Sequence, residues 1–133
     1  MRCVPPRRRH QLPVDQLTIQ STSVASRESV CDLGVYLDSD MSMHKHVTQL
    51  VCSCYGILRQ LRSIRCLLSH TALTTFVSSF LMSKVDYCNV VLAGLPLREF
   101  DRVQSVVNTA ARLSADACKY NHVTPLLMDL HWL

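Results

Sequence analysis

The sequence predicts a mainly α-helical fold, a bundle of about four helices preceded by a short β-hairpin. From residue 41 onward, apolar residues recur every three or four positions, which is the period of an amphipathic helix. Before residue 39, apolar residues fall in short β-branched runs beside Ser, Thr and Gly, a composition typical of strands and turns. A chain of 133 residues is long enough for one domain with a single core.

The first 38 residues divide into a tail and a β element. Residues 1–13 contain three prolines and a run of three arginines at 7–9, without a periodic apolar pattern, so we expect a disordered basic tail. Residues 14–38 are expected to form the short β element. Its strands are predicted at residues 17–19 and 30–37, paired as one hairpin across the Ser- and Thr-rich segment between them.

Residues 39–133 are expected to be helical, and the first helix follows Asp38. Ser39 or Asp40 can cap its amino end, and Arg62 and Arg65 lie near its carboxyl end, where the helix dipole favours cations. Its expected apolar face consists of Val47, Leu50, Val51, Cys54, Ile57, Leu58, Leu61 and Ile64.

Three further helices are expected. Ser69 can cap the second, Gly94 and Pro96 separate it from the third, and Thr124 with Pro125 can begin the fourth. The buried stripe expected in the second helix is Leu73, Phe76, Val77, Phe80 and Leu81. The apolar face expected in the third is Phe100, Val103, Val107, Ala110 and Ala111. The residues of the third helix expected to face water are Arg98, Glu99, Arg102 and Gln104.

The cysteines and histidines argue against a metal site. Residues two apart on a helix differ by about 200° around its axis, so neither the pair Cys52 and Cys54 nor the pair His44 and His46 is expected to face one ion. Seven cysteines at irregular spacing, without an apolar signal core after Met1, favour reduced thiols in an intracellular protein, cytoplasmic or nuclear. We expect no cofactor.

One segment raises the question of a membrane span. Residues 66–83 contain no Asp, Glu, Lys or Arg. Polar residues dilute this run, however, and Lys84 closes it. These polar residues are Ser69, His70, Thr71, Thr74, Thr75, Ser78 and Ser79. A buried amphipathic helix is therefore the better interpretation, and no membrane partner is expected.

Five strings of the sequence occur together in one known family. They are LGVYLD at 33–38, LRQLRSIRCLLS at 58–69, DYCNVVLAGLP at 86–96, NTAARL at 108–113 and HVTPLLMDLHWL at 122–133. In order and separation they resemble the carboxy-terminal part of LINE-type (non-LTR) retrotransposon reverse transcriptases, from about Pro13 to Leu133. The resemblance implies the palm–thumb junction followed by the helical thumb, which grips the RNA or DNA template–primer while an upstream palm carries out the chemistry.

The resemblance implies that basic residues on the helices contact the template–primer backbone, and the candidates are Lys45, Arg59, Arg62 and Arg65. On one helix Lys45 and Arg59 share a face, while Arg62 and Arg65 rotate away by about 60° each. The four basic residues therefore form a loose spiral around the helix. An ordinary solvated helix face explains this arrangement equally well.

The isolated chain is not expected to be an enzyme. Polymerisation needs paired carboxylates to hold two metal ions, and the adjacent Asp-Asp pair of the family's palm is absent. Asp38 and Asp40 are the nearest pair, and helix capping explains them. No catalytic residue is assigned.

The sequence also departs from the family's pattern. The loop after NTAARL, usually basic and Gly-containing, here reads Ser-Ala-Asp-Ala-Cys, and its Asp116 is expected to weaken phosphate binding. Ala93 replaces the usual aromatic residue before Gly-Leu-Pro, and the chain ends before the Pro that follows HWL. These departures favour a truncated, incomplete domain in which Trp132 and Leu133 remain uncovered.

Two alternatives remain open beside a truncated fragment with weak nucleic-acid binding. The first is a small helical protein-interaction module that uses uncovered apolar surface, including for self-association. The second is a transposon remnant without a selected function. Charged residues make up only 18% of the chain, which favours uncovered apolar surface in either case.

Overall fold

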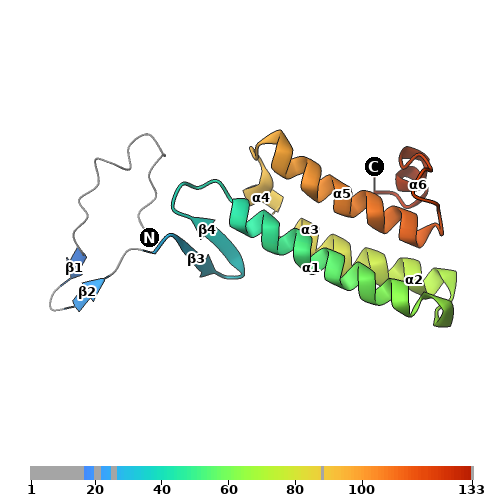
Figure 1. Ribbon diagram of the computed structural model, residues 1–133, viewed down its shortest axis with the longest axis horizontal. Coiled ribbons are helices and arrows are strands. Elements are labelled where there is room, and N and C mark those ends of the chain that lie inside the picture. The colour runs from blue at the N-terminus through green and yellow to red at the C-terminus, as the bar shows by residue number, and fades with distance from the viewer. Residues whose placement is uncertain (1–16, 20–21, 25–26, 88, 133) are drawn as a thin grey trace. The chain divides into compact units, whose positions relative to one another are not determined.

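The protein is mainly α-helical, with two small β-hairpins before the helices, as the computed structural model in Figure 1 shows. The structure describes residues 17–19, 22–24, 27–87 and 89–132. A mainly helical chain with a short β element in front was predicted, and this prediction is confirmed. The tail expected at residues 1–13 lies outside the described residues. The chain divides into two compact units, Met1–His46 and Val47–Leu133.

The β element consists of two hairpins, where the sequence analysis predicted one. Strand β1 (Leu17–Ile19) pairs with β2 (Thr22–Val24), and β3 (Ser29–Asp32) pairs with β4 (Val35–Asp38), both antiparallel. The predicted pairing of residues 17–19 with 30–37 is therefore wrong, because residues 30–37 fold back on themselves.

A two-residue turn causes this reversal. Asp32 pairs with Val35, and the two residues between them both have positive φ, 46° at Leu33 and 83° at Gly34. Positive φ at both central positions is the mark of a type I′ turn, whose twist suits a right-handed hairpin. Gly adopts this conformation without strain, whereas Leu does so at a cost.

Most of the remaining chain is helical. The helices are α1 (His44–Ser63), the 3₁₀ turn η2 (Arg65–Leu67), α2 (His70–Val77), the π turn η3 (Ser78–Met82), α3 (Ser83–Asp86), α4 (Asn89–Leu92), α5 (Leu97–Ser114) and α6 (Thr124–Asp129). The residues that flank η3 keep right-handed helical angles, so α2, η3 and α3 form one continuous rod. Gly94, with φ of 86°, lies between α4 and α5.

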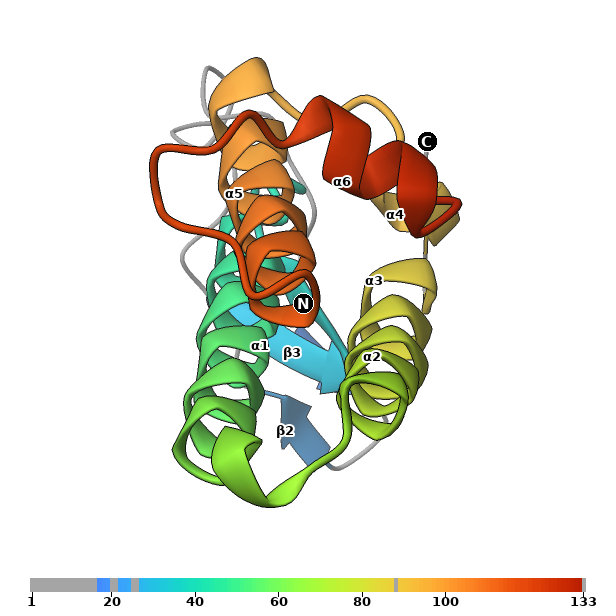
Figure 2. The ribbon, with the colours of Figure 1, turned by 90° about the vertical axis from the view of Figure 1, so that its right-hand side faces the viewer.

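Within Val47–Leu133, α1 and α5 run side by side in the same direction (Figures 1 and 2). Two hydrogen bonds join them in parallel order: Arg102 donates to the Thr48 hydroxyl at 3.1 Å, and the Tyr55 and Ser105 hydroxyls lie 3.1 Å apart. The core draws on α1, on the α2–η3 rod and on α5. Its members are Cys54, Leu58, Leu61, Leu73, Val77, Leu81, Val106 and Ala110.

The stripe predicted for the second helix is narrower than expected. Leu73, Val77 and Leu81 are buried, but the rings of Phe76 and Phe80 are 42% and 51% exposed and stack on each other, with centroids 6.2 Å apart. The expectation that both rings are buried was therefore wrong. In a straight α-helix, residues four apart are gradually displaced around the helix axis. The π turn is wider and reverses this displacement, so Leu81 lies on the same side of the helix as Val77.

The buried face of α5 is rotated from the predicted one. Val103, Ala110 and Ala111 are buried as expected, but Val106 takes the buried place predicted for Val107, and Phe100 is 55% exposed. Glu99, which was expected to face water, is buried.

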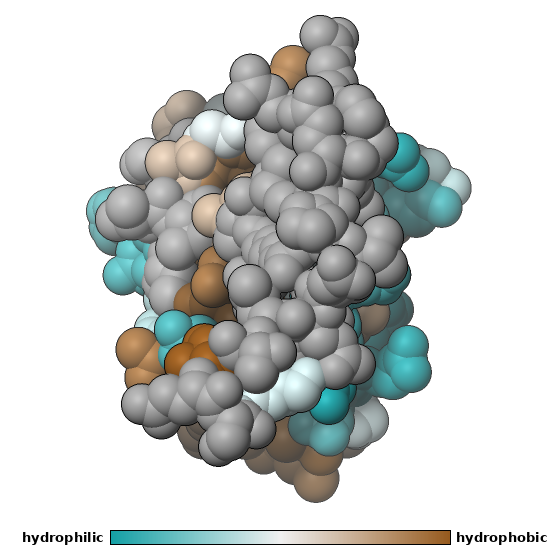
Figure 3. Space-filling model, turned by 90° about the vertical axis from the view of Figure 1, so that its left-hand side faces the viewer, coloured by the Kyte–Doolittle hydropathy of each residue, from teal (hydrophilic) through white to brown (hydrophobic). Residues whose placement is uncertain are grey.

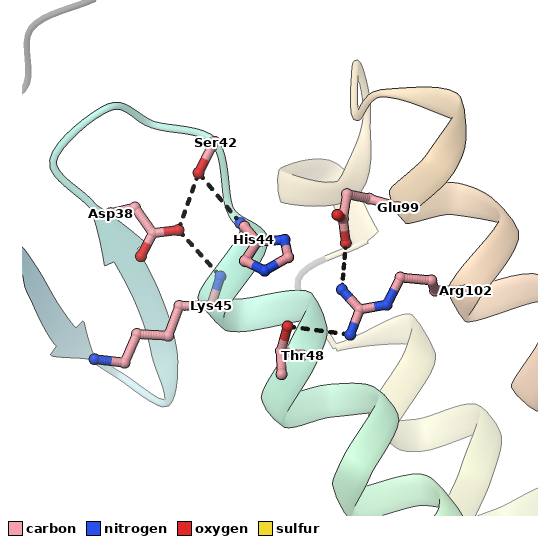
Figure 4. A network of polar contacts seen from close by, with 7 residues as sticks. All are labelled: Asp38, Ser42, His44, Lys45, Thr48, Glu99 and Arg102. Atoms are coloured by element: carbon pink, nitrogen blue, oxygen red, sulfur yellow. Dashed lines mark hydrogen bonds and ion pairs between the residues drawn. The ribbon is translucent and has the colours of Figure 1, made fainter. Parts of the chain in front are cut away.

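An ion pair accompanies this rotation. Arg102 donates to the Glu99 carboxylate at 2.7 Å and also to Thr48 of α1 (Figure 4). Pairing with Arg102 offsets the free-energy cost of removing the Glu99 carboxylate from water.

The helix ends are partly as predicted. The Ser69 hydroxyl accepts a hydrogen bond from the Ala72 amide at 3.2 Å and caps α2, as expected. Helix α6 begins at Thr124 itself without a side-chain cap, so the predicted Thr124 cap is wrong. Ile64 lies beyond α1 and is exposed.

The carboxyl-terminal apolar residues were expected to be uncovered. Trp132 instead packs against the core of its own chain, so this expectation is wrong for Trp132. Leu133 lies outside the described residues.

None of the helices in the described part of the chain combines the length and the apolar character that a membrane span requires.

The β3–β4 turn generates the first prediction. Gly34→Ala places a side chain at a positive φ and is expected to destabilise the hairpin by about 1 kcal/mol. Leu33→Asn relieves strain, because Asn tolerates this conformation, and is expected to stabilise it by roughly 0.5 kcal/mol or more. Amide hydrogen exchange at Val35 and Asp32 measures both effects.

The control for this pair is Val30→Thr, which changes a strand position and leaves the turn intact. Faster exchange in Leu33→Asn than in the unsubstituted chain would contradict the type I′ assignment.

Candidate nucleic-acid interface

The two carboxylates considered for metal binding lie at the turn before α1. One oxygen of Asp38 accepts hydrogen bonds from the Lys45 amide at 3.1 Å and the Ser42 hydroxyl at 3.2 Å (Figure 4). Asp40 accepts from the Ser42 amide at 3.2 Å. Asp38 therefore satisfies a free amide in the first turn of α1, a capping role that was predicted for Ser39 or Asp40.

The candidate metal ligands are spread over different environments. Cys54 is buried and Cys52 exposed, and His46 is buried while His44 is exposed, as expected for residues two apart on a helix. Across the described residues, no group of three His, Cys, Asp or Glu side chains could hold a metal ion.

The four candidate contacts to nucleic acid separate into two groups. The Lys45 ammonium hydrogen-bonds the Ser29 hydroxyl of β3, and both residues belong to Met1–His46. Arg59, Arg62 and Arg65 lie in the other unit, where they line one groove together. The structure thus brings three of the four together and leaves Lys45 out.

This basic groove has a volume of about 530 Å³ and lies entirely within Val47–Leu133. Five of its lining residues are basic, and none is acidic. The full lining is Tyr55, Leu58, Arg59, Arg62, Arg65, Thr109, Arg112, Leu113, Ala117 and Lys119.

The helices position these side chains by their spacing. On α1, Tyr55, Arg59 and Arg62 follow one another at steps of four and three, so they lie along one side of the helix. Arg65 belongs to η2 and therefore does not follow the helical rotation of α1. Its side chain can turn toward the same groove. Arg112 comes from the last turn of α5.

The groove is electropositive even after the opposing charges are counted. Its five cations are countered by the Asp116 carboxylate, which pairs with Arg65, and by the carboxyl ends of α1 and α5. Each helix end carries about half a negative charge, which leaves a net charge of about +3. A cavity of this sign attracts anions.

Most of the groove's cations are available to a ligand. Among the residues that the structure describes, only Arg65 of the five is in an ion pair, with Asp116 at 2.5 Å. The Nε of Arg112 is buried and has no hydrogen-bond partner there. The Lys119 ammonium lies 5.5 Å from the centre of the Tyr120 ring, which leaves its hydrogen-bonding capacity unused. Arg102, in contrast, is occupied by Glu99 and Thr48.

Sequence reasoning missed Arg112 and Lys119. Arg112 occupies the last turn of its helix, as Arg62 does in α1, and this shared position was the signal available. Nothing local in the sequence places Lys119 beside them, because it follows α5 in a loop.

Comparison of the chain with family models, curated proteins and solved structures finds no match.

The first turn of α1 holds a titratable group, His46. Its Nδ1 accepts a long hydrogen bond, 3.5 Å, from the Tyr36 amide, and its Nε2 is buried without a partner among the described residues. Burial lowers the pKa of the His46 imidazole below its ordinary value, because the charged form loses hydration.

This lowered pKa gives a prediction with a definite sign. The unfolded chain binds the His46 proton more readily than the folded chain, so stability is complete above about pH 6.5 and falls as the pH drops through the folded pKa. Urea midpoints measured over this range are expected to decrease with pH. His46→Gln should remove this component, whereas His44→Gln, at an exposed position, should retain it. Equal pH dependence in all three proteins would contradict the assignment.

Proposed function

We propose that this chain is a thumb-like region of a LINE-type reverse transcriptase and that it grips the backbone of an RNA or DNA template–primer weakly, without sequence preference. The observation that carries the proposal is the basic groove, where Arg59, Arg62 and Arg65 meet Arg112 and Lys119. The five sequence strings that resemble this family support it. We further propose that the chain alone is not an enzyme and that it acts inside the cell, in the cytoplasm or nucleus.

The composition of the groove favours a phosphate backbone over base edges. Arginine presents a planar set of donors that matches phosphate oxygens, and four of the five cations are arginines. Contacts of this kind position a duplex and carry no sequence information. A polymerase thumb needs that property, because it must hold any sequence while the duplex advances.

The salt dependence of binding tests the groove. With Arg65 paired to Asp116, four cations remain for phosphates, so the log–log salt slope for a short RNA–DNA hybrid is expected near about −3.6. Substituting Arg59→Gln together with Arg62→Gln removes two contacts and is expected to make the slope shallower by about 2. Fluorescence anisotropy over a salt series measures both slopes.

Two controls locate the binding. The matched variant Lys45→Gln with Arg98→Gln loses the same charge outside the groove and should keep the slope. A chain without residues 1–9 shows whether the basic tail supplies the affinity. An unchanged slope in the Arg59 and Arg62 variant, with binding lost on removal of the tail, would rule out the groove.

A second candidate function is a small protein-interaction module, favoured by exposed apolar side chains. On the face drawn in Figure 3, hydrophobic described residues, in brown, reach the surface among hydrophilic ones. Phe76 and Phe80, whose rings stack on each other, are also exposed. Other exposed apolar residues of the helical unit are Ile64, Leu67, Tyr87, Leu97, Phe100, Tyr120 and Met128.

Self-association tests this candidate. If the stacked rings bind a second copy, replacing Phe76→Gln and Phe80→Gln should shift the protein toward monomer in sedimentation velocity, because the apolar area that drives association is lost. Phe100→Gln is the matched control on another helix. An unsubstituted chain that is monomeric at every concentration would rule out self-association through these rings.

A further inference from the structure

The ion pair between Arg65 and Asp116 is formed at the edge of the basic groove. The Arg65 guanidinium lies 2.5 Å from the Asp116 carboxylate, and the two side chains are 41% and 65% exposed. Because both groups remain hydrated, the pair is weak and can be replaced by another anion. Arg65 itself lines the groove, so this carboxylate competes with any ligand for one of its five cations.

The backbone at Asp116 holds the carboxylate in place. Helix α5 ends as a Schellman motif, in which the Ala117 amide donates to the Arg112 carbonyl at 2.9 Å. Asp116 occupies the left-handed position of this motif, with φ of 51°, where glycine is the preferred residue. Aspartate adopts this conformation less readily than glycine, and from this position its side chain reaches Arg65.

The Arg112 guanidinium is a second group of the groove with unmet donor capacity. The Arg112 side chain lines the groove, and the Arg112 carbonyl accepts the hydrogen bond of the same Schellman motif. The Nε of Arg112 is buried and has no hydrogen-bond partner among the described residues. A buried donor of a charged group normally has an acceptor. Asp116 satisfies Arg65 alone, so the groove retains unmet donor capacity beside it.

We propose that the Asp116 carboxylate occupies a phosphate subsite of the basic groove, centred on Arg65, and that a backbone phosphate of the bound nucleic acid displaces it. This inference rests on the proposed nucleic-acid function. Carboxylate and phosphate both accept paired hydrogen bonds from a guanidinium, which lets one stand in for the other. Asp116 thus sets how tightly the groove binds, and its removal frees a fifth cation.

The test is Asp116→Asn, which removes the charge and retains a residue that tolerates left-handed angles. Binding of a fluorescent RNA–DNA hybrid is expected to strengthen about tenfold at roughly 50 mM salt, and the salt slope should steepen by about 1, the contribution of one added phosphate contact. Asp116→Gly is expected to do the same. Asp101→Asn, an exposed position on α5, is the matched control for the change in net charge.

The outcomes separate this inference from the proposed function. A salt slope steeper than that of the unsubstituted chain in both Asp116 variants, and not in Asp101→Asn, supports the phosphate subsite. Binding by the unsubstituted chain with equal slopes in Asp116→Asn and Asp101→Asn overturns the subsite and leaves the proposed function standing. Absence of binding in every protein overturns both.

Discussion

Cys54, Val77 and Ala110 have no exposed surface, and around them α1, α2 and α5 pack into one core. Two of these three side chains are small, which permits close approach of the helices that carry them. The parallel course of α1 and α5 follows from this packing and from the Thr48 and Tyr55 hydrogen bonds. Parallel helices bring their carboxyl ends to the same end of the unit. Their last-turn arginines, which each helix dipole favours separately, therefore become neighbours.

The periodicity of the sequence was sufficient to predict the helices and much of their buried face. Leu58, Leu73 and Val103 are buried where their spacing indicated, because the three-to-four period reports which side of a helix avoids water. The Ser69 cap was predictable because its hydrogen bond is local. Arg59 and Arg62 were both predicted as candidate contacts on a loose spiral, and they line one groove because residues three apart on a helix lie close together.

The remaining features depend on residues distant in the sequence. Arg102, which pairs with the buried Glu99, also bonds Thr48, 54 positions earlier, and no local pattern contains that second contact. On the same helix Glu99 is buried and Phe100 is exposed, the reverse of what was predicted. Lys119 joins the basic groove only because the chain after α5 turns back toward α1. Lys45, in contrast, was predicted to share a helix face with Arg59, but its ammonium hydrogen-bonds the Ser29 hydroxyl of β3.

The parallel arrangement of α1 and α5 also sets an order of assembly. Parallel neighbours cannot be joined by a tight turn, and the contacts between them span 50 and 54 residues. Closing so long a loop costs chain entropy before any packing is gained, whereas the β3–β4 ladder and the α2–η3–α3 rod use contacts that are near in sequence. The walls of the groove are therefore expected to come together late in folding. By the same reasoning, they are expected to separate early when the protein begins to unfold.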